Sequence, residues 1–265
     1  MIDTHCHLTF PQLSDRLDDV LLAASEAGVS QMISVGTTPA DAAKARDIAD
    51  RRPQVFFSAG IHPHYVDKAD ESELPYMAEL ANEERCVAFG EMGLDYHYDK
   101  PPRDLQQRLF NAQLEAIRYS EINKPIILHC RKAVDDTLAM LRASGLSADR
   151  FVFHCFTETP GEMRKVLDFG AMVSFTGIVT YKNAPEVREA CLLVPDDRIM
   201  VETDAPYLSP EPFRKVRPNE PRYVTATAAF LAELRKTDPQ AFEQQLDTNA
   251  RRFFRLPEPG QQEAR

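Results

Sequence analysis

The chain has 265 residues, of which 43% are hydrophobic and 27% are charged, and this composition is typical of a globular protein with a large core. Acidic residues outnumber basic ones by 41 to 31, and the net charge of -10 argues against a protein that binds nucleic acid through bulk charge alone. No apolar run approaches the roughly 20 residues that cross a bilayer, so we expect no membrane span.

The amino terminus and the cysteines favour a cytoplasmic protein. The first residues, Met1 to His5, contain neither a basic lead nor an apolar stretch, so we expect no secretory signal. The 5 cysteines are an odd number without a C-x-x-C pair, and this pattern favours free thiols over a disulfide framework. The oligomeric state stays open, and a monomer is compatible with the sequence.

Short β-rich runs alternate with helical segments along the chain. The helical patterns include Ser14 to Ala27, Arg103 to Ser120 and Lys132 to Ala143. Eight such alternations in about 250 residues predict an α/β fold, a (β/α)8 TIM barrel, with a doubly wound open sheet as the alternative. The predicted strands are Met1 to His7, Gln31 to Gly36, Val55 to Ile61, Val87 to Gly90, Pro125 to Cys130, Phe151 to Phe156, Ala171 to Phe175 and Arg198 to Glu202.

The predicted barrel fills most of the chain. We expect a single domain over residues 1–256, since no linker, repeat or low-complexity block interrupts it. The segment 257–265 is rich in Pro, Gly, Gln and Glu, a composition that predicts a flexible C-terminal tail.

Residues that can bind a metal stand at the ends of five predicted strands. In a parallel barrel these ends meet at one mouth, where such enzymes carry their sites. Imidazoles and carboxylates gathered there would be costly to desolvate without cations, and their number suits two divalent ions rather than one tetrahedral ion. Mg, Mn, Zn and Fe all accept such ligands. The candidate ligands are His5, His7, Glu91, His129, His154 and Asp204.

Strand alternation separates these histidines from the neighbouring cysteines. Cys6, Cys130 and Cys155 each stand next to a candidate histidine and therefore point to the opposite side of the strand. We predict that these thiols pack outward against the helices as small apolar groups and do not bind metal.

Six segments of the chain resemble the signatures of the TatD family of metal-dependent deoxyribonucleases. The resemblance covers nearly the whole chain, and it implies an amidohydrolase-like barrel with two divalent metal ions that hydrolyses phosphodiester bonds in DNA as a 3′-5′ exonuclease. The segments are Ile2 to His7, Gly60 to His64, Gly90 to Tyr96, Leu128 to Arg131, Phe153 to Phe156 and Glu202 to Leu208.

The resemblance also implies a division of the ligands between two ions. One ion is held by His5, His7, Glu91 and Asp204, and the other by Glu91, His129 and His154, so that Glu91 is the bridge. Asp95 is expected to orient a metal-binding histidine, because carboxylates commonly accept the second N–H of such a ring. We expect His64 and His97 on exposed loops.

Four residues near the predicted mouth are candidates for binding the substrate phosphate. His62 follows the third strand as a potential donor, and Arg131 follows His129. Arg214 and Lys215 stand in a basic loop after the last strand. The alternatives are an outward ion pair for Arg131 and a solvated loop for the other two cations. Metal ions and local cations would make the mouth positive although the whole chain is acidic.

The predicted reaction is metal-assisted hydrolysis with Glu91, Asp204 and His62 as catalytic residues. Asp204 would accept the proton of the attacking water. A shallow mouth favours single-stranded or frayed ends of DNA over a duplex. An ester or amide hydrolase of the same barrel class, including an aminoacyl-tRNA deacylase, is the alternative enzyme. A barrel that keeps its metal for stability alone is the non-catalytic alternative.

Overall fold

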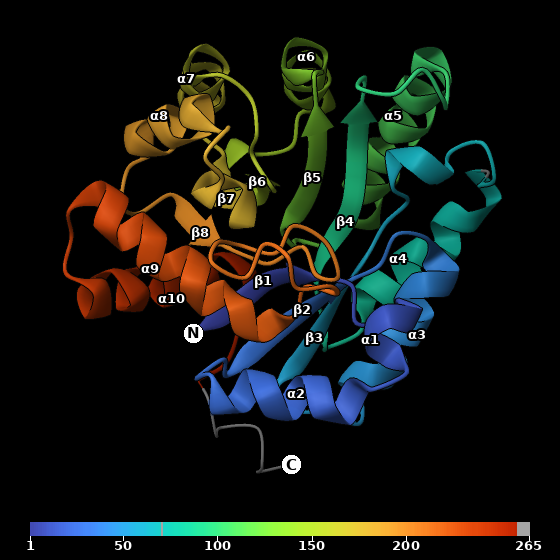
Figure 1. The fold of residues 1–265 in the computed structure, drawn as a ribbon. Helices are drawn as coiled ribbons and strands as arrows, with labels where there is room; N and C mark the ends of the chain where they lie inside the picture. Colours follow the sequence, from blue (N-terminus) through green and yellow to red (C-terminus); the bar gives the residue numbers. More distant parts are fainter. Residues whose placement is uncertain (70, 259–265) are drawn as a thin grey trace.

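The strands of the computed structural model, which describes residues 1–69 and 71–258, form one parallel sheet in the order β1 to β8 (Figure 1). Beyond β8, an isolated bridge pairs Ala205 with Cys6, and the Asp204 amide donates to the His5 carbonyl at 2.8 Å. These contacts bring the last strand back to the first and confirm the (β/α)8 barrel. The strands are β1 (Ile2–Cys6), β2 (Gln31–Val35), β3 (Val55–Ala59), β4 (Cys86–Asp95), β5 (Ile126–Arg131), β6 (Phe151–Phe153), β7 (Met172–Phe175) and β8 (Ile199–Val201).

Helices connect successive strands on the outside of the barrel, and α9 and α10 follow the last strand (Figure 1). No described helix is both long enough and apolar enough to span a membrane. The α-helices are α1 (Pro11–Ser14), α2 (Leu17–Glu26), α3 (Pro39–Ala49), α4 (Leu74–Asn82), α5 (Arg103–Ser120), α6 (Val134–Ser144), α7 (Pro160–Phe169), α8 (Pro185–Leu193), α9 (Val224–Arg235) and α10 (Pro239–Phe254). Short 3-10 turns are η1 (Pro63–Tyr65), η2 (Glu71–Glu73), η3 (Ala148–Arg150), η4 (Gly177–Thr180) and η5 (Pro221–Tyr223).

Local sequence signals explain where these helices lie. In α5, the buried residues Leu109, Phe110, Leu114 and Ile117 recur at helical spacing and form one apolar face against the sheet. At the start of α7, Thr159 and Glu162 form a reciprocal capping box, which satisfies amide groups that the first turn leaves unpaired. These signals are local, so the sequence predicts the ring of helices well.

The end of α10 closes the barrel at the end opposite the strand carboxyl termini. Phe253, Phe254 and Leu256 are buried in one cluster with Ile127 of β5 and Met200 of β8. A separate and larger core packs the strands against the surrounding helices. The interior of the barrel is therefore filled with side chains at its amino-terminal end, opposite the end where the strand carboxyl termini meet.

Two strands differ from the sequence-based bounds by three residues or more, and the others by one or two. β4 continues to Asp95 instead of ending at Gly90, and β6 ends at Phe153 rather than at residue 156. Gly93 (φ 142°) lets β4 continue against β5, because a Cβ there would lie 2.0 Å from the His129 carbonyl oxygen. Most of the expected tail over 257–265 lies outside the described residues, and the domain boundary stays a prediction.

We expect Gly93→Ala to lower the free energy of unfolding by roughly 3 kcal/mol or more, because the new methyl group meets the His129 carbonyl in a backbone conformation that L-residues rarely adopt. Gly145→Ala is the matched control, since Gly145 also has a positive φ but no atom within 4 Å of the added Cβ. It should cost only about 1 kcal/mol. Urea denaturation of both variants measures the difference, and equal losses would contradict the steric argument.

Candidate metal centre

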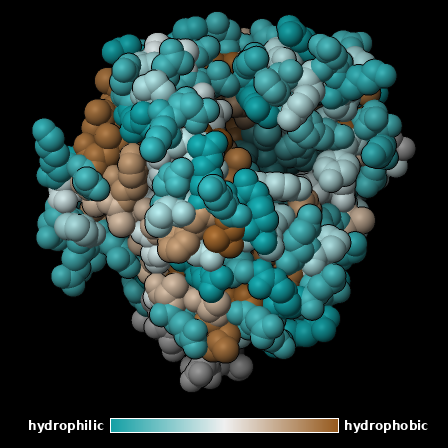
Figure 2. All heavy atoms as spheres, in the orientation of Figure 1, coloured by the Kyte–Doolittle hydropathy of each residue, from teal (hydrophilic) through white to brown (hydrophobic). Residues whose placement is uncertain are grey.

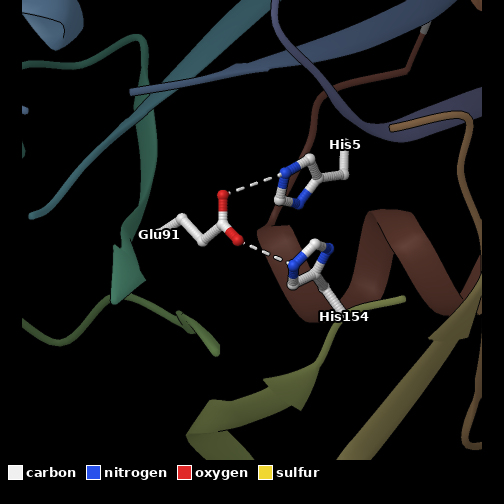
Figure 3. Close-up of side chains that lie close together, drawn as sticks. All are labelled: His5, Glu91 and His154. Atoms are coloured by element: carbon white, nitrogen blue, oxygen red, sulfur yellow. Dashed lines mark ion pairs between the residues drawn. The ribbon is translucent and has the colours of Figure 1, made fainter. Parts of the chain in front are cut away.

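Glu91 lies at the centre of a cluster of imidazole rings at the carboxyl end of the barrel. Figure 3 shows its two oxygens directed at different histidines: Oε1 lies 2.7 Å from His154 Nε2, and Oε2 lies 3.4 Å from His5 Nε2. Oε1 is also 2.9 Å from His129 Nδ1. One carboxylate thus contacts side chains from three other segments of the barrel, as a bridging ligand must.

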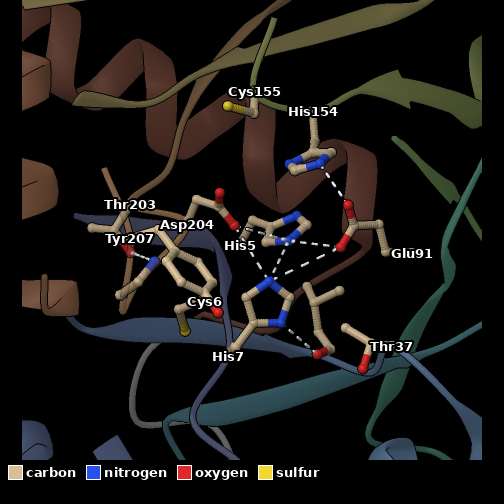
Figure 4. Close-up of polar contacts among 12 residues, drawn as sticks. His5, Cys6, His7, Thr37, Glu91, His154, Cys155, Thr203, Asp204 and Tyr207 are labelled. Atoms are coloured by element: carbon tan, nitrogen blue, oxygen red, sulfur yellow. Dashed lines mark hydrogen bonds and ion pairs between the residues drawn. The ribbon is translucent and has the colours of Figure 1, made fainter. Parts of the chain in front are cut away.

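The remaining ligand candidates complete the cluster on the β1 side. His7 Nε2 lies 3.3 Å from His5 Nε2 and 3.3 Å from Asp204 Oδ1 (Figure 4). His5, His7 and Asp204 form one group whose ligand atoms lie within 4.8 Å of one another, and His5, Glu91 and His154 form a second. The structure therefore brings together all six side chains that the sequence singled out as ligands.

The cluster forms the floor of a cavity of about 930 Å³. Figure 2 shows a hollow with a hydrophilic lining near the carboxyl end of β4. His5 is fully buried and Glu91 is only 2% exposed, whereas the Asp204 side chain retains 16% exposure. A small molecule can therefore reach Asp204 from the cavity, while His5 and Glu91 are shielded from water.

Three of the histidines have one ring nitrogen fixed by an acceptor outside the cluster. His7 Nδ1 donates to the Val35 carbonyl at 3.1 Å, and His129 Nε2 donates to Asp95 Oδ2 at 2.9 Å. His154 Nδ1 lies 3.3 Å from Glu202 Oε1. Because these acceptors hold the ring proton, the nitrogen that faces the cluster carries a lone pair in the neutral ring.

The direction of these lone pairs indicates which kind of ion the centre can bind. In their neutral forms, the inward nitrogens of His129 and His154 present lone pairs to Glu91 Oε1 at 2.9 and 2.7 Å, and two acceptors at that distance repel each other. A cation or an added proton between them removes the repulsion. His5 Nδ1 is buried without a hydrogen-bond partner among the described residues. A donor set of imidazoles and carboxylates with inward lone pairs fits divalent metal ions.

The charges of the cluster are strongly coupled. Burial alone would raise the pKa of Glu91, but His62, His154 and His5 lower it well below its usual value. Burial would likewise lower the pKa of His154, yet Glu91 and Glu202 raise it well above its usual value. The centre therefore contains a buried, ionised carboxylate, which is stable only when positive charge lies beside it.

His62 differs from the other histidines in its hydrogen bonding. Its Nδ1 accepts the backbone amide of His64 at 3.0 Å, so the ring proton of neutral His62 lies on Nε2. That nitrogen faces Glu91 Oε1 at 3.3 Å. Burial lowers the pKa of His62 to about 4, which keeps the ring neutral at neutral pH. His62 thus presents an N–H donor, not a lone pair, to the cavity.

Asp95 lies behind His129, where the sequence had placed a carboxylate that orients a ligand. The same Asp95 Oδ2 accepts from His64 Nε2 at 2.9 Å. Burial would raise the pKa of Asp95, but the hydrogen bonds from His129 and His64 lower it. His64, expected on an exposed loop, instead lines the cavity and supports this contact.

The four phosphate-binding candidates separate into two pairs. His62 and Arg131 line the cavity, and the Arg131 guanidinium lies 5.4 Å from the centre of the Tyr98 ring. Arg214 instead stacks on Tyr181 at 3.7 Å, and Lys215 is exposed. Neither Arg214 nor Lys215 is among the described residues that line the cavity. Lys132 does line it, although the sequence had not singled it out.

Glu202 is a buried carboxylate that sequence reasoning missed. Its Oε1 accepts the Cys155 amide at 2.7 Å and faces His154, and its Oε2 accepts the Ser174 hydroxyl at 2.7 Å. The signal that could have identified it is a carboxylate at the end of a buried strand, two residues before Asp204. Glu202 holds His154 as Asp95 holds His129.

The prediction of outward thiols holds for Cys130 but is wrong for Cys155. Cys130 Sγ lies 3.5 Å from Thr137 Oγ1 of α6, on the helix side of the sheet. Both Cys130 and Cys155 are among the residues that line the cavity, but Cys155 Sγ lies 3.4 Å from Thr176 Oγ1, just after β7, and not against an α-helix. Strand alternation fails there because β6 has already ended at Phe153. Burial raises the pKa of the Cys155 thiol well above its usual value, so it does not offer a thiolate.

Known proteins resemble this chain over almost its full length. A family model described as "TatD related DNase" matches residues 2–255. A Bacillus subtilis protein named "Uncharacterized metal-dependent hydrolase YabD" is 36% identical over 97% of this chain and 99% of its own length. The "3'-5' ssDNA/RNA exonuclease TatD" of Erwinia billingiae is 36% identical over 97% of this chain and 100% of its own length. The crystal structure of YJJV, a TatD homologue from Escherichia coli, is 28% identical and superimposes with a TM-score of 0.91 over 97% of this chain and 98% of that chain.

Asp3 links β1 to the segment that follows β8, directly beside the cluster. It is fully buried, and it accepts the Thr203 amide at 2.9 Å and the His5 amide at 3.3 Å. Burial raises the pKa of Asp3 to about 8. The folded protein therefore binds a proton at Asp3 over a pH range in which the unfolded chain has already released it.

We accordingly expect Asp3 to make the protein less stable as the pH rises from about 4, where the unfolded carboxyl ionises, to about 8. Asp3→Asn keeps the shape and removes this titration, so the variant should lose less stability than the native protein between pH 5 and pH 8. Urea unfolding at both pH values measures it. The same pH slope in the two proteins would show that Asp3 ionises normally.

Proposed function

This chain belongs to the TatD family of metal-dependent hydrolases, and from that premise we propose that it hydrolyses phosphodiester bonds in single-stranded DNA from the 3′ end. The observation that carries the proposal is the convergence of imidazole nitrogens on the buried Glu91 carboxylate, at the floor of an open cavity. A centre of this kind suits the hydrolysis of phosphate esters.

We propose that two divalent cations occupy the centre. His5, His7, Glu91 and Asp204 would hold one, and Glu91, His129 and His154 the other. The short contacts from both Glu91 oxygens to different rings support the bridging role. When bound, such ions lower the pKa of water toward neutrality and stabilise the charge that develops on phosphoryl oxygens.

The chain's own residues supply the remaining steps. Asp204, a partly exposed carboxylate beside the cavity, accepts a proton from the attacking water. His62 donates its Nε2–H to a phosphate oxygen, because its other nitrogen is already occupied by the His64 amide. Arg131, on the cavity wall, pairs with a neighbouring phosphate of the strand.

The shape of the cavity supports a strand end as substrate. Its volume of about 930 Å³ lies within the usual range of small-molecule sites and is too small to enclose a duplex. Aromatic side chains on its wall, Tyr65, Tyr98 and Tyr207, offer surfaces on which unpaired bases stack. The 3′-5′ direction rests on the name of the Erwinia billingiae relative.

We expect the purified protein with Mg²⁺ or Mn²⁺ to shorten single-stranded DNA labelled at its 5′ end, one nucleotide at a time from the 3′ end. Glu91→Ala should lower the rate by at least about 10³-fold, because removal of a bridging ligand disables more than the loss of one hydrogen-bond donor. Glu158→Gln is the matched control, since Glu158 lines the same cavity but belongs to none of the candidate ligand groups.

Turnover of other substrates, measured under the same conditions, distinguishes the nuclease from the alternative hydrolases. Faster turnover of an aminoacyl-tRNA ester or of a simple lactone than of DNA would replace the nuclease by an ester hydrolase. Cleavage of DNA by Glu91→Ala at the native rate and saturating metal would remove the proposed centre from the reaction altogether.

A second test separates the donor role of His62 from a ligand role. We expect His62→Ala to lower kcat/KM by about 10²-fold, the usual effect of losing a donor to a charged oxygen, without changing the metal content. His154→Ala, which removes a proposed ligand, should lower the metal content itself. Elemental analysis alongside kinetics provides both readouts, and equal loss of metal from the two variants would make His62 a ligand.

A further inference from the structure

A second cavity, of about 590 Å³, lies at the amino-terminal end of the barrel, opposite the metal centre. Its walls come from segments that immediately precede β5, β6, β7 and β8 and from the end of α10. The residues used below are Arg150, Arg198, Arg252 and Arg255, together with the acidic Asp149 and Asp197 on the same walls.

The cavity concentrates positive charge that the carboxylates on its own walls offset only in part. Within the part of the chain that the structure describes, none of its four arginines forms an ion pair, although two carboxylates line the same walls. Four guanidinium groups and two carboxylates leave two positive charges in one concave space. Burial and the neighbouring charge of Arg255 lower the pKa of Arg150. Like charges gathered in this way favour an anionic ligand.

The guanidinium groups are also held in position. Arg150 Nη2 donates to the Ile122 carbonyl at 3.0 Å, Arg198 Nη1 to Leu167 at 2.9 Å, and Arg255 Nη1 to Asn123 at 2.8 Å. Arg252 Nη2 donates to the Asp197 carbonyl.

Each of these four side chains keeps a second terminal nitrogen that has no acceptor among the described residues. The bonds to backbone carbonyls explain why the arginines are ordered, but they do not explain the free donors that remain. Ordered guanidinium groups with unused N–H donors bind phosphate with little further loss of side-chain entropy.

Apolar groups form another part of the wall. Phe253 and Met172 are 9% and 7% exposed, and Pro125 lies on the same cavity. A phosphate ion makes no favourable contact with these apolar surfaces, whereas a planar nucleotide base can pack on them. The volume lies within the usual range of small-molecule sites.

We propose that this cavity binds a mononucleotide, with its phosphate on the arginines and its base on the apolar wall. The two surplus positive charges match a phosphate monoester dianion. The site is separate from the metal centre and does not depend on the hydrolase activity proposed for it.

The test is a calorimetric titration of the metal-loaded protein with deoxyadenosine 5′-monophosphate, inorganic phosphate and deoxyadenosine. We expect the nucleotide to bind more tightly than phosphate, and deoxyadenosine to bind least. The double variant Arg252→Gln/Arg255→Gln should weaken nucleotide binding at this site at least tenfold, while any binding at the metal centre persists. Arg164→Gln is the matched control, because Arg164 is exposed and donates to a backbone carbonyl outside the cavity, and it should change affinity less than twofold.

Asp149→Asn provides a test that leaves every arginine in place. It removes a negative charge from the wall, so it should tighten nucleotide binding two- to fivefold. A crystal soaked in tungstate should show an anomalous peak among the four arginines. Native affinity in the double variant, or no response to Asp149→Asn, would overturn the site. Phosphate binding as tightly as the nucleotide would overturn the role of the base.

Discussion

The chemistry of this protein depends on a carboxylate that water does not solvate. An ionised Glu91 inside the barrel costs several kcal/mol unless positive partners surround it. Its partners are imidazole nitrogens, and the direction of their lone pairs is set elsewhere: Val35 O fixes His7, Asp95 fixes His129 and Glu202 faces His154. The proposed centre therefore has two layers, in which the outer acceptors hold the ring protons and so leave lone pairs on the nitrogens that face Glu91.

Irregular strand pairing in the barrel positions the residues of this cluster. The pairing of β1 with β2 shifts register between Asp3 and Cys6, and the pairing of β4 with β5 shifts between Phe89 and Met92. These irregularities coincide with His5 and Glu91, and a bulge re-aims side chains that an even strand would direct elsewhere. A regular β-ladder holds the barrel together, whereas local exceptions to it orient the candidate ligands His5 and Glu91.

The sequence could predict the features that depend on residue patterns within one segment, but not those that depend on contacts between segments far apart in the chain. The candidate ligands could be found because each stands near the end of a strand as the sequence predicts it, and the barrel topology brings those ends together even where the true strand, as in β4, runs further. The extension of β4 to Asp95 and the inward place of Cys155 could not, since they depend on how far a strand pairs with its neighbour. The sequence predicted His62 as a donor, but which of its ring nitrogens carries the proton depends on one amide hydrogen bond from His64, which no pattern of residue types encodes.

The acidic surplus of the chain, -10 overall, is compatible with the anionic substrate proposed for it, because the charges are unevenly distributed. A long polyanion approaching the outer surface meets net repulsion, which salt screens beyond about 10 Å. Attraction is confined to concave sites, and at one of them Arg131 and Lys132 lie beside the proposed metal centre. Only a group small or thin enough to enter the cavity experiences that attraction in full. This distribution of charge supports the proposed preference for strand ends over duplexes, because such a preference depends on where the cations lie and not on how many there are.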